Sequence, residues 1–184
     1  MPRIPELLPA DMTPAQRAVA AELTSGPHGG IRGPHGIWLR VPELARRARS
    51  LSEFIRFQSG LPKRLLELAI LVGGRFWQAE FEFYAHAKLG KQAGLDEALI
   101  RAIAAGHRPT FSQPNDAIVY DLCTELFETR RVGDATYDKA VAALGLQAVI
   151  EIVATIGYYS MVSLTLNAFA VPLPAGEPSP FPDK

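Results

Sequence analysis

The sequence of 184 residues contains very little cysteine and no excess of charge of either sign. Its single cysteine, Cys123, excludes a disulfide within the chain, a metal site made only of cysteines and a redox centre with two cysteines of one chain. The 19 Lys and Arg residues balance the 19 Asp and Glu residues. This balance excludes a broadly basic nucleic-acid surface, so we expect no nucleic-acid partner.

The sequence also has no secretory signal pattern and no long uninterrupted apolar run. Prolines at positions 2, 5 and 9 stand where a signal peptide needs an unbroken apolar stretch, so we expect a cytoplasmic protein. The most apolar stretch, residues 152–166, is interrupted by polar residues at helical spacing. We therefore expect a buried helix there, with no membrane span and no membrane partner.

No run of alternating polar and apolar residues predicts a strand, whereas glycines and prolines separate helical patterns along the chain. A short helix is predicted from Pro14 to about Leu23, and seven more follow at 42–59, 62–73, 77–93, 96–105, 115–130, 134–144 and 146–169. The length and the 48% apolar content favour one domain. We predict an all-α, single-domain bundle of about seven helices, with an extended proline-rich tail.

Glu67 is the only charged residue in the apolar segment from Leu65 to Val72. A carboxylate in such a helix loses contact with water, which raises its pKa and suits it to proton transfer. The alternative interpretation is an ordinary ion pair between Glu67 and Lys63 or Arg64.

Glu82 and His86 are four residues apart in a second helical segment, so they share one face. A carboxylate beside an imidazole is a common acid–base arrangement. The same spacing also occurs in plain surface pairs, and Glu80 and Tyr84 repeat it on another face. Two ligands on one helix do not make a zinc site. Glu67, His28 or His35 could complete one, but nothing in the sequence requires it, and we expect neither a metal nor another cofactor.

A glycine-rich segment, residues 25–36, contains His28, Arg32 and His35. Such loops bind anions through backbone N–H groups and guanidinium groups, although a turn-rich connection with solvent-facing histidines has the same composition. It has no dinucleotide or phosphate-loop fingerprint. Polar positions on the last helix, Tyr158 among them, would either line a pocket or satisfy one another between packed helices.

Several segments in order resemble the carboxymuconolactone decarboxylase family, which includes the alkylhydroperoxidase D type of enzyme. The resemblance rests on Leu65–Leu68, Gln78–His86 and Ala93–Leu95, with Gly33-Pro34, Trp38-Leu39, Pro42–Leu44, Tyr158-Tyr159 and the ending 167–173. It covers about residues 30–173, which we predict as the family's helical domain. Residues 1–29 are then an N-terminal arm and first helix, and residues 174–184 are a C-terminal tail.

The resemblance implies an all-helical fold that assembles as a homotrimer or hexamer, with the active site between helices. In the peroxidase branch of the family, a helix carries Cys-x-x-Cys followed by a histidine, and a glutamate lies on the preceding helix. Here the glutamate matches Glu67 and the histidine matches His86, but the cysteine positions hold Ala79 and Glu82. Thiol peroxidase chemistry needs a thiolate and a resolving thiol, so this departure disfavours it.

The resemblance therefore favours a cofactor-independent lyase similar to 4-carboxymuconolactone decarboxylase, acting on a small carboxylated lactone or related ring compound. In this hypothesis His86 donates the proton, Glu82 orients the His86 imidazole, and Glu67 is a second acid or base. The expected substrate-binding residues are Arg32, His35, Arg75, Tyr84 and Tyr158. Two alternatives stay open: an alkylhydroperoxidase-like antioxidant enzyme, and a non-catalytic ligand-binding oligomer.

Overall fold

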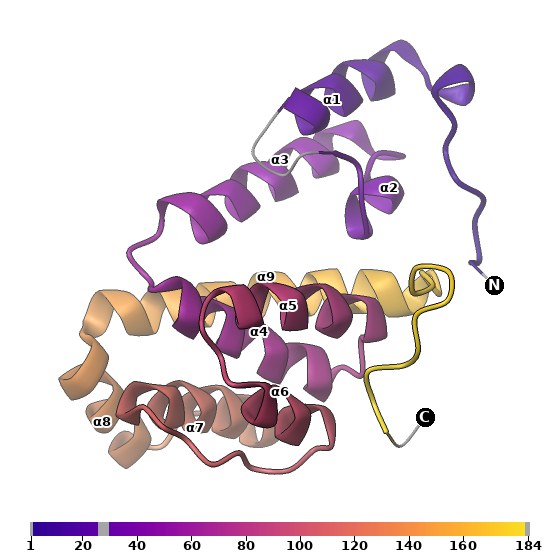
Figure 1. Ribbon diagram of the computed structural model, residues 1–184. Helices are drawn as coiled ribbons and strands as arrows, with labels where there is room; N and C mark the ends of the chain where they lie inside the picture. The colour runs from indigo at the N-terminus through magenta and orange to yellow at the C-terminus, as the bar shows by residue number, and fades with distance from the viewer. Residues whose placement is uncertain (1, 26–29, 183–184) are drawn as a thin grey trace.

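The helices form two parts in the computed structural model, which describes residues 2–25 and 30–182 (Figure 1). The upper group consists of α1 (Pro14–Ser25), α2 (Pro34–Trp38) and α3 (Pro42–Glu53). The lower body consists of α4 (Lys63–Phe76), α5 (Glu80–Gln92), α6 (Glu97–Ala104), α7 (Pro114–Thr129), α8 (Asp134–Leu144) and α9 (Leu146–Ala168). A 3-10 turn, η1 (Pro9–Asp11), precedes α1, and a π-helical turn, η2 (Phe54–Gln58), follows α3.

The all-α prediction is confirmed, because the described residues contain helices and no strand. The expected number of about seven helices was too low, since this part of the chain has nine α-helices. The short helix α2 begins within the glycine-rich segment and has only five residues, too few for an apolar period to reveal it. The helix predicted at 42–59 ends its α-helical part at Glu53 and continues as η2.

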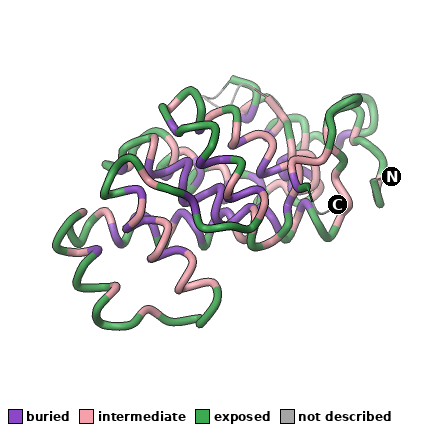
Figure 2. Tube along the Cα trace, turned by 60° about the horizontal axis from the view of Figure 1, so that its bottom comes forward, coloured by how far each residue is buried: buried purple, intermediate pink, exposed green. Residues whose placement is uncertain are grey.

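Helix α4 forms the centre of the lower body. Ten consecutive residues, 65–74, are buried, which is typical of a helix that is covered on every side. The helix packs against α5, α7 and α9, and Figure 2 shows buried segments gathered inside the body with exposed segments around it. It continues through Gly73 and Gly74, where a helix end was predicted. A Cβ atom at Gly73 would lie 3.3 Å from the Phe127 ring, so glycine allows this close packing.

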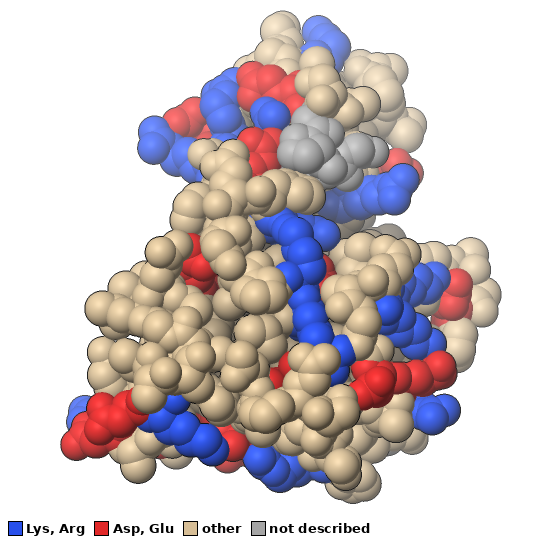
Figure 3. Space-filling model, turned by 60° about the vertical axis from the view of Figure 1, so that its left-hand side comes forward, with Lys and Arg blue, Asp and Glu red and all other residues tan. Residues whose placement is uncertain are grey.

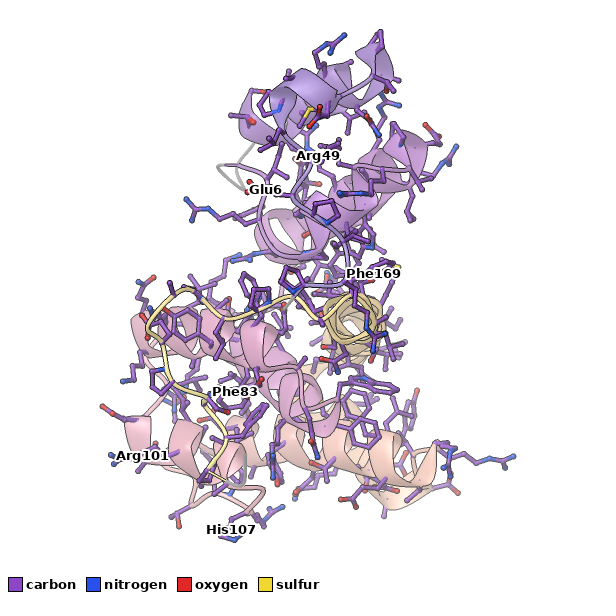
Figure 4. All side chains as sticks on the ribbon, turned by 90° about the vertical axis from the view of Figure 1, so that its right-hand side faces the viewer. Glu6, Arg49, Phe83, Arg101, His107 and Phe169 are labelled. Atoms are coloured by element: carbon purple, nitrogen blue, oxygen red, sulfur yellow. The ribbon has the colours of Figure 1, made fainter. Side chains whose placement is uncertain are left out.

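The upper group rests on the body through α2 and the N-terminal segment. Trp38 Nε1 donates a hydrogen bond to Thr165 Oγ1 on α9 at 3.1 Å, and the Trp38 ring lies 6.2 Å from the Tyr158 ring. The backbone N–H of Arg3 donates to the carbonyl of Phe169 at 3.0 Å. Figure 4 shows Phe169 where the upper group meets the end of α9. These contacts hold the upper group over α5 and α9.

The C-terminal tail is non-helical, as predicted for an arm, but it packs against its own chain. Phe181 is 1% exposed and its ring lies 5.1 Å from that of Phe83 on α5. The Ser179 hydroxyl donates to Glu80 Oε1 at 2.5 Å, and Tyr84 donates to Glu177 Oε1 at 2.6 Å. The tail is therefore anchored along α5, because a buried aromatic ring and side-chain hydrogen bonds compensate for its lack of helix.

Helix α9 is long and apolar enough to cross a membrane by length and composition alone, and it is the only such helix in the described ranges. Within its most apolar window, 56% of the residues are buried inside the protein. Its contacts with α4, α7 and α8 are those of a core helix in a globular helical domain.

Candidate active site

A tight turn between α4 and α5 brings Glu67 and His86 together, although they lie 19 positions apart in the sequence. The turn occupies 77–79, where Gln78 has a φ of +50° and the Ala79 N–H donates to the Gly74 carbonyl at 2.9 Å. For this reason α5 begins at Glu80 and not at the predicted residue 77. The two buried helix faces then meet, with His86 Nδ1 2.6 Å from Glu67 Oε2.

Glu82 contacts the other nitrogen of the same imidazole. Its Oε1 lies 2.9 Å from His86 Nε2, as the spacing of four residues on one helix predicts. This contact is an ion pair whose direction is poor for a hydrogen bond from the ring N–H. All three residues are 4% exposed, so the imidazole is held between two carboxylates away from bulk water.

The charge of His86 is decided by two opposing effects. Burial by itself disfavours the protonated ring, but the nearby carboxylates of Glu82 and Glu67 outweigh it and raise the pKa of His86 to about 9. At neutral pH the ring is therefore an imidazolium, with Nδ1–H donating to Glu67. A protonated imidazole in this position can act as a general acid.

Two tyrosines of α9 cover the imidazole. The Tyr159 ring lies edge-on to His86 at 5.0 Å, and the Tyr158 ring lies 5.3 Å from that of Tyr159. Burial raises the pKa of Tyr158 to about 12 and that of Tyr159 well above its ordinary value. Both hydroxyls therefore stay protonated and able to donate hydrogen bonds.

A cavity of about 520 Å³ opens beside His86 and Glu82, between the upper group and the helices α5 and α9. Its wall comes from the segment before and within α2, from α3 and η2, from α5, from α9 and from the tail. The lining residues are Gly30, Arg32, Gly33, Pro34, His35, Ser52, Arg56, Phe81, Glu82, Tyr84, Ala85, His86, Lys88, Leu89, Tyr158, Tyr159, Val162 and Pro174. Figure 3 shows Lys and Arg side chains running down from the junction between the two parts of the molecule.

Most of the residues predicted from the sequence meet at this cavity. His86, Glu82, Arg32, His35, Tyr84 and Tyr158 all line it. Glu67 does not line the cavity, because it lies behind His86. Glu67 contacts the ring at Nδ1, whereas Glu82 lies at Nε2 on the side of the cavity.

Arg75, which the sequence predicted to bind substrate, does not line this cavity. Its guanidinium lies 5.0 Å from the Phe181 ring and close to Gly106, at a separate small hollow. The reason is its place near the end of α4, on the side covered by the tail.

The alternative ion pairs for Glu67 are not formed. Arg64 contacts the fully buried carboxylate of Asp116, with a shortest distance of 2.6 Å. Lys63 is near enough for the Glu67 charge to affect its pKa, but burial lowers that pKa overall. Among the described residues, the ionic partner of Glu67 is therefore His86.

Four further polar side chains line the cavity that the sequence did not single out as substrate-binding: Ser52, Arg56, Lys88 and Tyr159. Tyr159 follows Tyr158 directly in the sequence, so the two tyrosines lie on neighbouring faces of one helix, and this adjacency could have indicated Tyr159. For Ser52 and Arg56, the only indication in the sequence is their separation by four residues, which places them on one helix face. Their place in the cavity wall depends on how the upper group packs over the body, and a local sequence pattern does not predict that packing.

The described residues contain no group of three His, Cys, Asp or Glu side chains that could hold a metal ion. His28, one of the alternative ligands, lies outside the residues that the structure describes. His35 lines the cavity and contacts the Trp38 ring edge-on at 5.5 Å.

Cys123 is fully buried on α7, away from the cavity wall. Burial raises the pKa of its thiol to about 12, so it is not a thiolate at neutral pH. The cysteine positions of the peroxidase motif are occupied by the buried Ala79 and by Glu82.

The chain matches no family model and no curated protein in sequence comparison. Two solved structures share its fold. One is a protein of unknown function from Agrobacterium tumefaciens, provisionally assigned as the antioxidant defence protein AhpD, with 15% identity, a TM-score of 0.69 and coverage of 78% of this chain and 99% of that one. The other is an uncharacterised peroxidase-related protein from Silicibacter sp. TM1040, with 14% identity, a TM-score of 0.75 and coverage of 95% and 94%. The chain therefore shares the all-helical fold of these two proteins.

Proposed function

We propose that the protein is a cofactor-independent lyase that uses acid–base chemistry on a small carboxylated lactone or related ring compound. The observation that carries the proposal is the buried imidazolium of His86, held by Glu67 and Glu82 at the wall of a cavity of about 520 Å³. Cavities of this size accommodate small organic molecules. The family resemblance of the surrounding segments supports the reaction class.

Decarboxylation of such a substrate needs a dry site and a proton donor. The bond to the carboxylate breaks, CO₂ leaves, and the electron pair moves into the conjugated lactone carbonyl. His86 then gives its Nε2 proton to carbon, and solvent restores it. Glu67 keeps the ring in place through Nδ1 during both steps. The Glu82 carboxylate raises the pKa of His86 and so keeps the proton donor protonated.

A thiol peroxidase is the competing function, because the two similar structures are described as antioxidant or peroxidase-related. The chemistry of the site opposes it: the positions of the two thiols hold Ala79 and Glu82, and Cys123 is buried with a raised pKa. A ligand-binding protein without catalysis is the other alternative. The convergence of Glu67 and Glu82 on the imidazole of His86, which lines the cavity, favours an enzyme over it.

The test is turnover of 4-carboxymuconolactone and related unsaturated lactone acids, followed by CO₂ release and ultraviolet absorbance. We expect His86→Gln to reduce kcat by about a hundredfold or more, as loss of a general acid does. His107→Gln is the matched control, because His107 is an exposed histidine outside the cavity. Full activity of His86→Gln on any substrate would refute the assignment. Peroxide turnover that disappears in Cys123→Ser would establish the competing function instead.

A further inference from the structure

Arg56 occupies an unusual position in the backbone, on the π-helical turn η2. The N–H of Ser59 donates to the carbonyl of Phe54, five residues earlier, at 2.8 Å. Such turns insert an extra residue into a helix and are frequent at functional sites, because they shift the direction of a side chain. Here Arg56 lines the cavity together with Ser52, whereas Phe54 and Phe57 on the same segment are 43% and 46% exposed.

The guanidinium of Arg56 lacks an anionic partner within the described ranges. Its Nε–H is buried and donates to no acceptor there, and no carboxylate of those residues lies within ion-pair distance. The arginines of α3 differ in this respect, since Arg46, Arg47 and Arg49 each pair with a glutamate. Arg56 as a whole is half-buried, but a buried N–H donor without an acceptor is costly, so a ligand that accepts this hydrogen bond would be favoured.

The charged side chains around the cavity have a net charge of plus one, which a bound anion would balance. The cationic side chains in its wall are Arg32, Arg56, Lys88 and protonated His86. Among the described residues, three carboxylates contact two of these groups: Glu67 and Glu82 at His86, and Glu177 at Lys88. The balance is one positive charge, and Arg56 is the cation with the buried, unsatisfied donor.

We propose that Arg56 binds one carboxylate of a small anionic substrate whose ring packs against Phe81, Tyr158 and Tyr159. The guanidinium presents parallel N–H donors that match the two oxygens of a carboxylate. The Ser52 hydroxyl, which interacts with that of Tyr158, lies beside it. This inference rests on the proposed function for the use of the cavity, and it identifies the residue that selects an anion.

Binding of benzoate to the full chain tests the inference, because benzoate has a ring and a carboxylate but undergoes no turnover. Benzamide has nearly the same shape without the charge, and inorganic phosphate has the charge without the ring. Ligand-observed NMR near neutral pH gives the dissociation constants. We expect benzoate to bind at least about tenfold more tightly than benzamide or phosphate, and Arg56→Met to weaken benzoate about tenfold or more.

Arg47→Met is the matched control, because Arg47 is 78% exposed on α3 and lies outside the cavity wall. It should leave benzoate binding unchanged, and Arg56→Lys should fall between wild type and Arg56→Met. In wild type the Nε–H resonance of Arg56, identified by its loss in Arg56→Lys, should shift when benzoate is added. This measurement on the wild-type protein tests the inference even if Arg56→Met does not fold.

Equal benzoate affinity in wild type and folded Arg56→Met would overturn the inference. Benzamide or phosphate binding as tightly as benzoate would overturn it too, and so would absence of benzoate binding at its solubility limit. The two proposals fail separately. Full turnover by His86→Gln with loss of benzoate binding in Arg56→Met would remove the acid assignment and leave the anion site standing.

Discussion

His86 Nδ1 and Glu67 Oε2 lie 2.6 Å apart across the interface of α5 and α4. Both side chains are 4% exposed, so the contact is a charged hydrogen bond in a site with little water. It joins the central helix of the body to the helix that forms one wall of the cavity. The position of the imidazole is thus set by the packing of the core, and its charge is set by two carboxylates.

We expect Glu67→Gln to lower the pKa of His86 from about 9 toward the ordinary value of an imidazole. Burial lowers the pKa of His86, and in this variant only the Glu82 carboxylate would be left to raise it. Titration of the ring nitrogens by ¹⁵N NMR measures this change. Glu97→Gln, on the exposed side of α6, is the control and should leave it unaltered. An unchanged pKa in Glu67→Gln would show that Glu67 does not hold the charge of the ring.

The stability of the protein should fall as the pH rises through the folded pKa of His86. That pKa, about 9, is raised above the value of about 6.5 for an unfolded chain. The folded state therefore binds the proton more tightly, and this contribution is complete below about pH 6.5 and is lost through about pH 9. Urea unfolding at a series of pH values measures it. His86→Gln should show a weaker decline over this range, and identical slopes would contradict the raised pKa.

Phe181→Ala should detach the tail from α5. The ring is 1% exposed and packs on Phe83 and Arg75, and its loss should reduce the free energy of unfolding by about 3 kcal/mol. Limited proteolysis should then cleave the tail while the helices stay intact. Phe54→Ala, at a ring that is 43% exposed, should cost much less. Equal losses for the two variants would mean that the tail does not contribute to the core.

Self-association remains a prediction from the family resemblance, which implies a trimer or hexamer. Helix α9 exposes Leu146, Ile150, Val153 and Leu164 at 43–59%, an apolar row that a second copy of the chain would cover. Ile150→Glu should therefore lower the molar mass measured by light scattering after size-exclusion chromatography. Tyr137→Glu on α8 is the control. A monomeric wild-type protein would contradict the prediction.

Local patterns predicted much of the helical structure because helix formation depends on residues three and four apart. Glycines and prolines placed most boundaries within a few residues. The errors lie where geometry departs from that period: the five-residue helix α2, the π turn η2, and the bend at Gln78, which has a positive φ. Each involves a few residues, too few to leave a periodic signal.

The sequence by itself determined the all-α fold class, the pairing of Glu82 with His86 on one helix face, and the absence of the two thiols from their motif positions. Only the tertiary structure decided that Glu67 approaches the far nitrogen of His86, that Arg56 enters the cavity and Arg75 does not, and that Phe181 is buried. The physical reason is the range of the interactions. Spacing on one helix follows from 3.6 residues per turn, whereas contacts between helices depend on how whole surfaces pack against each other.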